Sequence, residues 1–227
     1  MRMVSVIFDL EGTLVQSVPM TDRAILEFRK ETRRTLVELG VPKEILADAE
    51  TSTLMRNRAR EYADSNLTTS EKHGLMEGLD RFLLGYELKW AQDSTRFSDT
   101  VPTLGTLRSR GIKMAVVTNT STQAAEAILS KHELADYFTT VVTRNDVELL
   151  KPDPQGTLLA IERLHDRNPV FVGDLPVDIE AARGAGIKSV LVKRDWPNHV
   201  FSSNTQPDHV VGSLSEIPVI LEEIRSL

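Results

Sequence analysis

Three acidic side chains follow two short apolar runs of the sequence. Asp9 comes directly after the run 4–8, and Asp174 and Asp178 follow the run 170–173. Such runs, rich in β-branched residues, are typical of strands buried on both faces of a parallel sheet. Ligands of these sheets bind beyond the carboxyl ends of the strands. The three carboxylates could therefore supply a nucleophile and the hard oxygen ligands that suit Mg²⁺.

Each of these residues also has an ordinary structural explanation. Asp and Gly are common wherever a strand ends, so Asp9 alone is most simply a turn residue. An Asp in the first turn of a helix is favoured by the helix dipole, which would explain Asp174 or Asp178 as a cap. One acidic residue directly after Gly173 at a strand end, with a second four residues later, is harder to explain in this way.

Two further segments lie where strands should end or loops should turn. Thr118 and Asn119 follow an apolar run and could face a phosphate with a hydroxyl and backbone N–H groups. Taken alone, the segment 118–121 is more simply explained as a helix N-cap, and the two explanations are compatible. Lys151 stands in a loop that Pro152 and Pro154 restrict. A fixed ammonium there could neutralise a carboxylate or a phosphoryl oxygen, although a lone lysine in a loop is usually solvated.

The elements that must position these residues change character along the chain. From about 21 to 90 the sequence is polar and periodic, with helices expected near 43–64 and 70–91 and no convincing strand. From about residue 100, strands and helices alternate. The strands are expected at 112–118, 138–143, 169–172, 188–192 and 210–211, and the helices between and after them at 122–134, 154–166, 177–183 and 214–226.

This alternation predicts βαβ units and a parallel sheet. We therefore expect an α/β fold, with a Rossmann-like parallel sheet core formed by residues 1–16 and 95–227. The segment 17–94 is expected to form an inserted α-helical domain. At 227 residues, the chain is long enough for one substantial core and a smaller inserted domain.

Composition excludes several classes of function. The chain is 41% hydrophobic and 26% charged, which is typical of a soluble globular protein. Its formal net charge of −6 argues against nucleic-acid binding, and basic segments such as 56–60 are expected on solvated helix faces. No apolar stretch approaches the roughly 20 residues that span a bilayer, so no membrane partner is expected.

The chain contains no cysteine, which excludes disulfides, thiolate catalysis and cysteine-ligated metals. Its five histidines are scattered without metal-ligand spacing. The apolar run before Asp9 is too short for the core of a signal peptide, so a cytoplasmic location is expected.

In their order along the chain, the four polar segments resemble the motifs of the haloacid dehalogenase-like (HAD) hydrolase superfamily. The segment 9–13 resembles the first motif and Thr118-Asn119 the second. Lys151-Pro152 resembles the third motif and the segment 173–178 the fourth. The resemblance spans essentially the whole chain, and the helical segment 17–94 is similar to the mobile helical cap of the phosphatase branch.

The resemblance implies a Mg²⁺-dependent phosphatase that acts on a small phosphorylated metabolite. Asp9 would attack the phosphate monoester and form an aspartyl-phosphate, Lys151 would orient Asp9, and Glu11 would exchange protons. The implied substrate-binding residues are Gly12, Thr13, Thr118, Asn119 and Lys151. The implied metal-binding residues are Asp9, Glu11 through its backbone carbonyl, Asp174 and Asp178.

Glu11 is a departure from the family, whose phosphatases usually carry Asp at this position. Its side chain is one methylene longer, and general acid–base catalysis contributes about 10²–10⁴-fold, so its placement matters. A 2-haloacid dehalogenase, in which Asp9 displaces halide from carbon, is one alternative. A catalytically impaired member that binds a phosphorylated ligand is another. A phospho-acceptor receiver domain fits less well, because it is about half as long and its acceptor follows a middle strand. Glu11 keeps a protonatable group that dehalogenation does not need, which favours the phosphatase.

Overall fold

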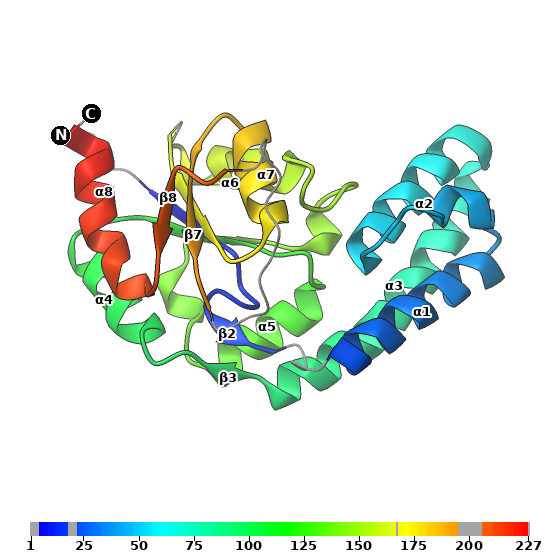
Figure 1. Ribbon diagram of the computed structural model, residues 1–227, viewed down its shortest axis with the longest axis horizontal. Coiled ribbons are helices and arrows are strands. Elements are labelled where there is room, and N and C mark those ends of the chain that lie inside the picture. Colours follow the sequence, from blue (N-terminus) through cyan, green and yellow to red (C-terminus); the bar gives the residue numbers. More distant parts are fainter. Residues whose placement is uncertain (1–4, 18–21, 167, 195–205, 227) are drawn as a thin grey trace.

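Six parallel strands form the central sheet of the computed structural model, which describes residues 5–17, 22–166, 168–194 and 206–226 (Figure 1). The strand order is β5-β4-β1-β6-β7-β8. The strands are β1 (Val6–Phe8), β4 (Met114–Val117), β5 (Thr140–Val142), β6 (Val170–Gly173), β7 (Lys188–Val192) and β8 (His209–Val211). The first strand is central, with Ile7 opposite Ala115 on one side and Phe171 on the other. The expected parallel α/β fold is therefore confirmed.

Alternate residues of each strand pack on opposite faces of the sheet, as the two-residue period of a strand requires. Val6 and Phe8 belong to one buried cluster and Ile7 to another, and all three are fully buried. The face of Phe8 is covered by helices α4 (Thr100–Ser109), α5 (Thr122–Lys131) and α8 (Ile217–Ser226). The opposite face is covered by helices α6 (Gln155–Leu164) and α7 (Pro176–Gly184).

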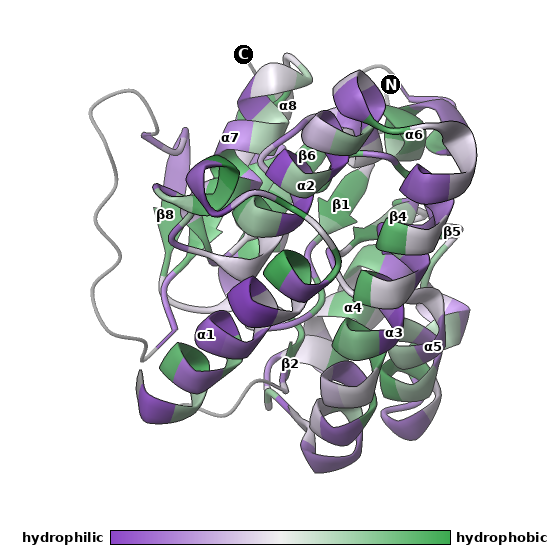
Figure 2. Cartoon of the chain, turned by 90° about the vertical axis from the view of Figure 1, so that its right-hand side faces the viewer, coloured by the Kyte–Doolittle hydropathy of each residue, from purple (hydrophilic) through white to green (hydrophobic). Residues whose placement is uncertain are grey.

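Three helices form a second unit, here called the helical block, between the first strand and the rest of the sheet. They are α1 (Asp22–Glu38), α2 (Ser52–Asn66) and α3 (Thr69–Asp93). The block has its own apolar cluster, which includes Leu36, Met55 and Leu79, and no strand lies within 24–90. Figure 1 shows the block beside the sheet, and Figure 2 shows that the visible surface of α1 is largely hydrophilic.

The helix predicted over 43–64 is wrong for residues 43–51. A 3-10 helix at Lys43–Leu46 is followed by a turn, and α2 begins only at Ser52. Thr51 provides the reason, because its hydroxyl accepts from Leu54 N (3.1 Å) and caps the new helix start. The turn itself is held by Arg33, which donates to the carbonyl of Ala49 (2.8 Å).

Two short strands join the helical block to the sheet. Strand β2 (Val15–Gln16) pairs antiparallel with β3 (Thr95–Arg96), where the chain leaves the first strand and where it returns. Nearby, the Thr100 hydroxyl donates to the carbonyl of Leu14 (2.8 Å). This pair was not predicted from the sequence, because two-residue strands show no hydrophobic period. Among the described residues, no helix has both the length and the apolar character that crossing a bilayer requires.

Candidate active site

Asp9 lies at the carboxyl end of β1, the central strand. Its backbone N–H donates to the carbonyl of Val172 on β6 (2.9 Å), so the adjacent strand fixes the start of the following turn. The side chain is buried, and its Oδ1 accepts from Lys151 Nζ at 2.6 Å. A carboxylate held in this way is oriented, and it keeps its second oxygen free of the lysine.

Asp174 directly follows β6, the strand adjacent to β1, and Asp178 lies in the first turn of α7. Carboxylate oxygens of the three residues lie within 4.8 Å of one another, and all three side chains are buried. Asp178 makes the contact expected of a first-turn residue and a second contact within the cluster, and its role as a metal ligand stays a prediction. Its Oδ2 accepts from Leu175 N (3.0 Å), as a first-turn residue can, and its Oδ1 accepts from Lys151 Nζ (2.7 Å).

Glycines make room for these carboxylates. Gly12 has φ = +90°, a conformation that L side chains rarely adopt, and a Cβ there would overlap the Asp174 carboxylate. A Cβ at Gly173 would overlap the side chain of Asp178. The two glycines therefore permit the close approach of turn and carboxylate, which is a structural reason for Gly12 in addition to the predicted contact with substrate.

The Lys151 ammonium connects the carboxyl ends of β1 and β4 with the first turn of α7. Besides Asp9 and Asp178, its ammonium donates to the carbonyl of Val117 at the end of β4 (2.9 Å). Lys151 is 4% exposed, so all three contacts are shielded from water. The expectation that a loop lysine is usually solvated does not apply here.

Charge is unbalanced in this cluster. Burial raises the pKa of Asp9 to about 7, with the charge of Lys151 opposing the shift and that of Asp178 adding to it. Burial and the charges of Asp9 and Asp178 also raise the pKa of Asp174 well above its ordinary value. The charges of Asp178 and Asp9 outweigh burial and raise the pKa of Lys151.

Three buried carboxylates beside one ammonium are a donor set that fits a divalent cation. Oxygen ligands suit Mg²⁺, and its charge would offset the excess of negative charge. The predicted ligands Asp9, Asp174 and Asp178 are therefore brought together, and the cluster is chemically suited to the predicted metal.

Thr118 and Asn119 follow β4, next to β1. Thr118 is buried, and its hydroxyl accepts from Thr120 N (3.2 Å). The helix N-cap expected in the segment 118–121 is confirmed at Ser121, whose hydroxyl accepts from Ala124 N (3.3 Å), which leaves Thr118 outside the cap. The Asn119 side chain is paired with the backbone of Lys151, a contact described below.

Thr13 is fully buried, and its hydroxyl donates to Asp174 Oδ1 (2.8 Å). It thereby orients a predicted metal ligand, and its predicted contact with substrate stays a prediction.

Glu11 lies at the edge of the carboxylate cluster and lines a cavity of about 130 Å³ between sheet and helical block. Burial raises the pKa of Glu11; a hydrogen bond from Ser17 (2.8 Å) opposes this shift, and the charge of Glu87 adds to it. A raised pKa suits a group that must donate a proton near neutral pH. Phe28 and Trp90 of the helical block line the same cavity and contact each other edge to face.

The polar residues that the helical block and β5 bring to this cavity were not predicted from the sequence. Arg144 is 2% exposed and forms ion pairs with Glu87 and, at 3.1 Å, with Asp80. It follows β5 as Thr118-Asn119 follow β4, so its place at a strand end was an available signal. Arg56 also lines the cavity and is 3% exposed, which corrects the expectation that segment 56–60 lies on a solvated helix face.

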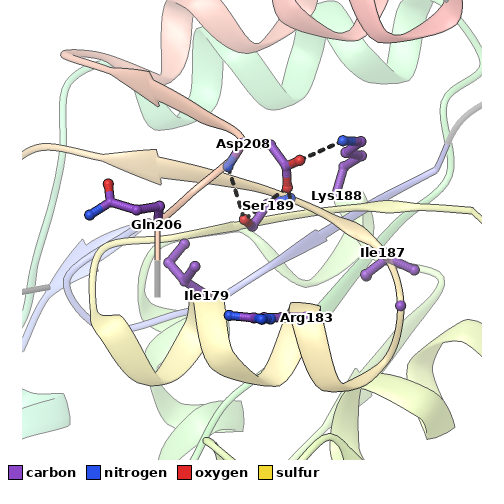
Figure 3. A pocket seen from close by; sticks show the side chains of 8 residues that line it. Ile179, Arg183, Ile187, Lys188, Ser189, Gln206 and Asp208 are labelled. Carbon is purple, nitrogen blue, oxygen red and sulfur yellow. Dashed lines mark hydrogen bonds and ion pairs between the residues drawn. The ribbon is translucent and has the colours of Figure 1, made fainter. Parts of the chain in front are cut away.

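A second cavity, of about 420 Å³, lies at the amino-terminal ends of β7 and β8, opposite to the carboxyl ends beside the candidate active site (Figure 3). Asp208, which lines this cavity, accepts from Lys188 Nζ (2.5 Å) and from Ser189 N (2.9 Å). Because the predicted site residues lie at the other end of the strands, this cavity is separate from the candidate active site.

Comparison with known proteins agrees with this arrangement. The sequence model of the haloacid dehalogenase-like hydrolases matches residues 3–186. A phosphoglycolate phosphatase of Shigella boydii is 29% identical over 230 residues, covering 93% of this chain and 90% of that protein. That of Escherichia coli K12 is also 29% identical, with the same coverage. The crystal structure of a HAD phosphatase from Thermococcus onnurineus gives a TM-score of 0.61 at 28% identity, covering 96% of this chain and 98% of that one.

This chain therefore belongs to the haloacid dehalogenase-like hydrolases. The resemblance inferred from its four motifs is confirmed, as is its assignment as a hydrolase. The roles of individual residues stay predictions.

Proposed function

We propose that this hydrolase is a Mg²⁺-dependent phosphatase that cleaves a small phosphorylated metabolite through an aspartyl-phosphate on Asp9. The observation that carries the proposal is the buried cluster of Asp9, Asp174 and Asp178 around the ammonium of Lys151. A nucleophilic carboxylate beside a hard-oxygen donor set is what attack on a phosphate dianion needs.

In the first step, a carboxylate oxygen of Asp9 attacks phosphorus, and the bond from phosphorus to the ester oxygen breaks. The bonding electrons leave with that oxygen, which takes a proton from Glu11. In the second step, Glu11 accepts a proton from water, whose oxygen attacks phosphorus and releases phosphate and the Asp9 carboxylate. Lys151 keeps Asp9 oriented and offsets the negative charge that gathers during both steps.

Asp9, the backbone carbonyl of Glu11, Asp174 and Asp178 would hold the Mg²⁺. When bound, this cation supplies positive charge that reduces repulsion between the anionic nucleophile and the phosphate. Thr118 and the backbone of Asn119 would bind the phosphoryl oxygens, together with Gly12 and Thr13.

We further propose that the helical block, within residues 17–94, acts as a mobile cap that excludes water and contacts the leaving group. The cavity of about 130 Å³ is suited to a small leaving group. Because the relatives described above are phosphoglycolate phosphatases, 2-phosphoglycolate is the first substrate to test. The cytoplasmic location stays a prediction.

The two alternatives make different demands on the site. Dehalogenation needs neither a cluster of metal-binding carboxylates nor a protonatable Glu11, so both features favour the phosphatase. An impaired member would bind phosphorylated ligands and leave them intact.

A panel of phosphorylated metabolites that includes 2-phosphoglycolate, together with 2-chloropropionate, distinguishes these functions. Each compound is incubated with the protein, with Mg²⁺ or with excess chelator. We expect phosphate release that requires Mg²⁺ and that falls by at least about 10²-fold in Asp174→Ala. Halide release in chelator would identify the dehalogenase instead, and tight binding of a phosphate ester without turnover would identify the impaired member.

A further inference from the structure

Two asparagines hold consecutive residues of the loop that carries Lys151. Asn119, after β4, donates to the Lys151 carbonyl (3.1 Å) and accepts from Lys151 N (3.0 Å). Asn57, on α2 of the helical block, makes the same two-point contact one residue earlier. It donates to the Leu150 carbonyl (2.8 Å) and accepts from Leu150 N (2.9 Å).

From this pairing we propose that Asn57 is a positioning residue for Lys151, through which docking of the helical block completes the catalytic site. The inference rests on the proposed function only in giving Lys151 a catalytic role. Asn57 itself contacts the Leu150 backbone and not the carboxylates, so it acts through the loop.

Burial makes the contact strong. Asn57 is 7% exposed and Leu150 is 3% exposed, so water is excluded from both hydrogen bonds. The Leu150 carbonyl also accepts from Asp153 N (3.0 Å), but within the described residues Asn57 is the partner of the Leu150 N–H. A backbone donor left buried without an acceptor is destabilising, so the loop shifts rather than stays in place when Asn57 is removed.

A shift of this loop reaches the Lys151 ammonium. The ammonium donates to Asp9, Asp178 and the Val117 carbonyl at 2.6–2.9 Å, three acceptors that fix its position in space. Hydrogen bonds weaken steeply when distance and angle depart from these values. A displacement of about 1 Å near a reacting group can cost about 10²-fold in rate.

Two other contacts join α2 to this loop at Glu148 instead of Leu150. One of them provides a control for the general loss of a contact between the helical block and the loop. Arg60 forms an ion pair with Glu148, whose carboxylate is largely exposed, and Arg56 donates to the Glu148 carbonyl (3.1 Å). Glu148→Gln therefore removes one bridge between the helical block and the sheet, and leaves both hydrogen bonds to Leu150 in place.

The test compares Asn57→Ala and Asn57→Asp with Glu148→Gln. Asn57→Asp retains the acceptor for Leu150 N–H and the side-chain volume, but loses the donor. It serves as the second variant if Asn57→Ala does not fold. Turnover of 4-nitrophenyl phosphate gives kcat and KM. Without substrate, carbamylation of Lys151 by cyanate, mapped by mass spectrometry against the exposed Lys30, reports whether the ammonium is held.

We expect Asn57→Ala to lower kcat by at least about tenfold, to change KM by less than about threefold, and to speed carbamylation of Lys151 by at least about tenfold. Asn57→Asp should change kcat and carbamylation in the same direction, because a carboxylate oxygen then faces the Leu150 carbonyl, and Glu148→Gln should resemble the wild type in all three quantities. Equal carbamylation of Lys151 in the Asn57 variants and in Glu148→Gln would overturn the proposal. The carbamylation measurement needs no turnover, so it tests the role of Asn57 even if the protein hydrolyses no phosphate ester.

Discussion

Four buried residues beyond the carboxyl ends of the strands set the charge of the site. Asp9, Asp174 and Asp178 carry three negative charges when ionised, and Lys151 offsets one of them. Burial prevents water from screening the remainder, which explains why the pKa values of Asp9 and Asp174 are raised. A divalent cation would bring the four groups close to neutrality. Glu11 is not one of the three clustered carboxylates; its carboxyl accepts from Ser17 and lines the cavity.

The acid–base role of Glu11 can be tested by two substitutions. An alkoxide leaving group needs a proton in the transition state, whereas nitrophenolate needs little help. Glu11→Gln should therefore slow the first turnover of an alkyl phosphate by about 10²–10⁴-fold and that of 4-nitrophenyl phosphate much less. Steady-state turnover should fall for both, with a burst of nitrophenol as the phosphoenzyme accumulates.

Glu11→Asp provides the matched comparison, because it keeps the carboxyl and shortens the arm to the usual length in the family. This variant should retain activity or raise it. Turnover of alkyl phosphates by Glu11→Gln at the wild-type rate, without a burst, would show that another group supplies the proton.

At the scale of elements, the sequence predicts the sheet better than the helical block. Strands β1, β4 and β6 are expected from continuous apolar runs, because strands buried on both faces have few polar residues to interrupt them. The 43–64 helix is mispredicted because the cap at Thr51 competes with helix propensity. The buried charge of Arg56 could not be predicted, since its burial depends on contacts with Asp80 and Glu148 that are distant in sequence.

In the candidate site, too, residues placed by local sequence could be predicted, whereas contacts between distant segments could not. Asp9, Lys151, Asp174 and Asp178 could be located because they follow strands or lie in a restricted loop. The contact between Asn57 and Leu150 joins residues 93 positions apart. No local pattern specifies such a pair, so the contribution of the helical block became visible only in three dimensions.

The helical block should lose stability separately from the sheet, because the two have different apolar clusters. Leu79 is fully buried in the block, and Leu79→Ala should cost about 2–5 kcal/mol. Hydrogen exchange should show faster exchange in α2 and α3, with β1 and β4 still protected. Leu104→Ala, in α4 against the sheet, should give the opposite pattern. If each variant lost hydrogen-exchange protection equally in the helical block and in the sheet, the block would not be a separate unit of stability.

At the scale of the whole molecule, the candidate site depends on parts of the chain that are far apart. The first strand supplies Asp9, the second half of the sheet supplies Asp174 and Asp178, and α2 secures the loop of Lys151. A second set of long-range hydrogen bonds centres on Asp99, which accepts from Arg194 (3.0 Å), Ser213 (2.8 Å) and Leu214 N (2.9 Å). This link ties the start of α4 to the C-terminal segment.

The link at Asp99 predicts a pH-dependent contribution to stability. Burial would raise the pKa of Asp99, but the hydrogen bonds from Arg194, Leu214 and Ser213 outweigh it and lower the pKa below its ordinary value of 3.8. The stabilisation is therefore present above that value and is lost as pH falls through the lower, folded-state pKa. Asp99→Asn should cost about 1.5–3 kcal/mol in urea unfolding near neutral pH. The difference from wild type should narrow in acid, and a difference that is independent of pH would contradict this account.

The central claim is that Asp9 carries the phosphoryl group during turnover, and a chemical quench tests it most directly. The protein is mixed with Mg²⁺ and radiolabelled 4-nitrophenyl phosphate, quenched in acid during the first turnover, and digested for peptide mapping. We predict label on the peptide that contains Asp9, stable in acid and released by hydroxylamine as an acyl phosphate is. The label should be greater in Glu11→Gln and absent from a folded Asp9→Asn variant, which should also lose turnover by at least about 10³-fold. Phosphate release by the wild type with no label on Asp9 at any quench time, or undiminished turnover in Asp9→Asn, would contradict the account.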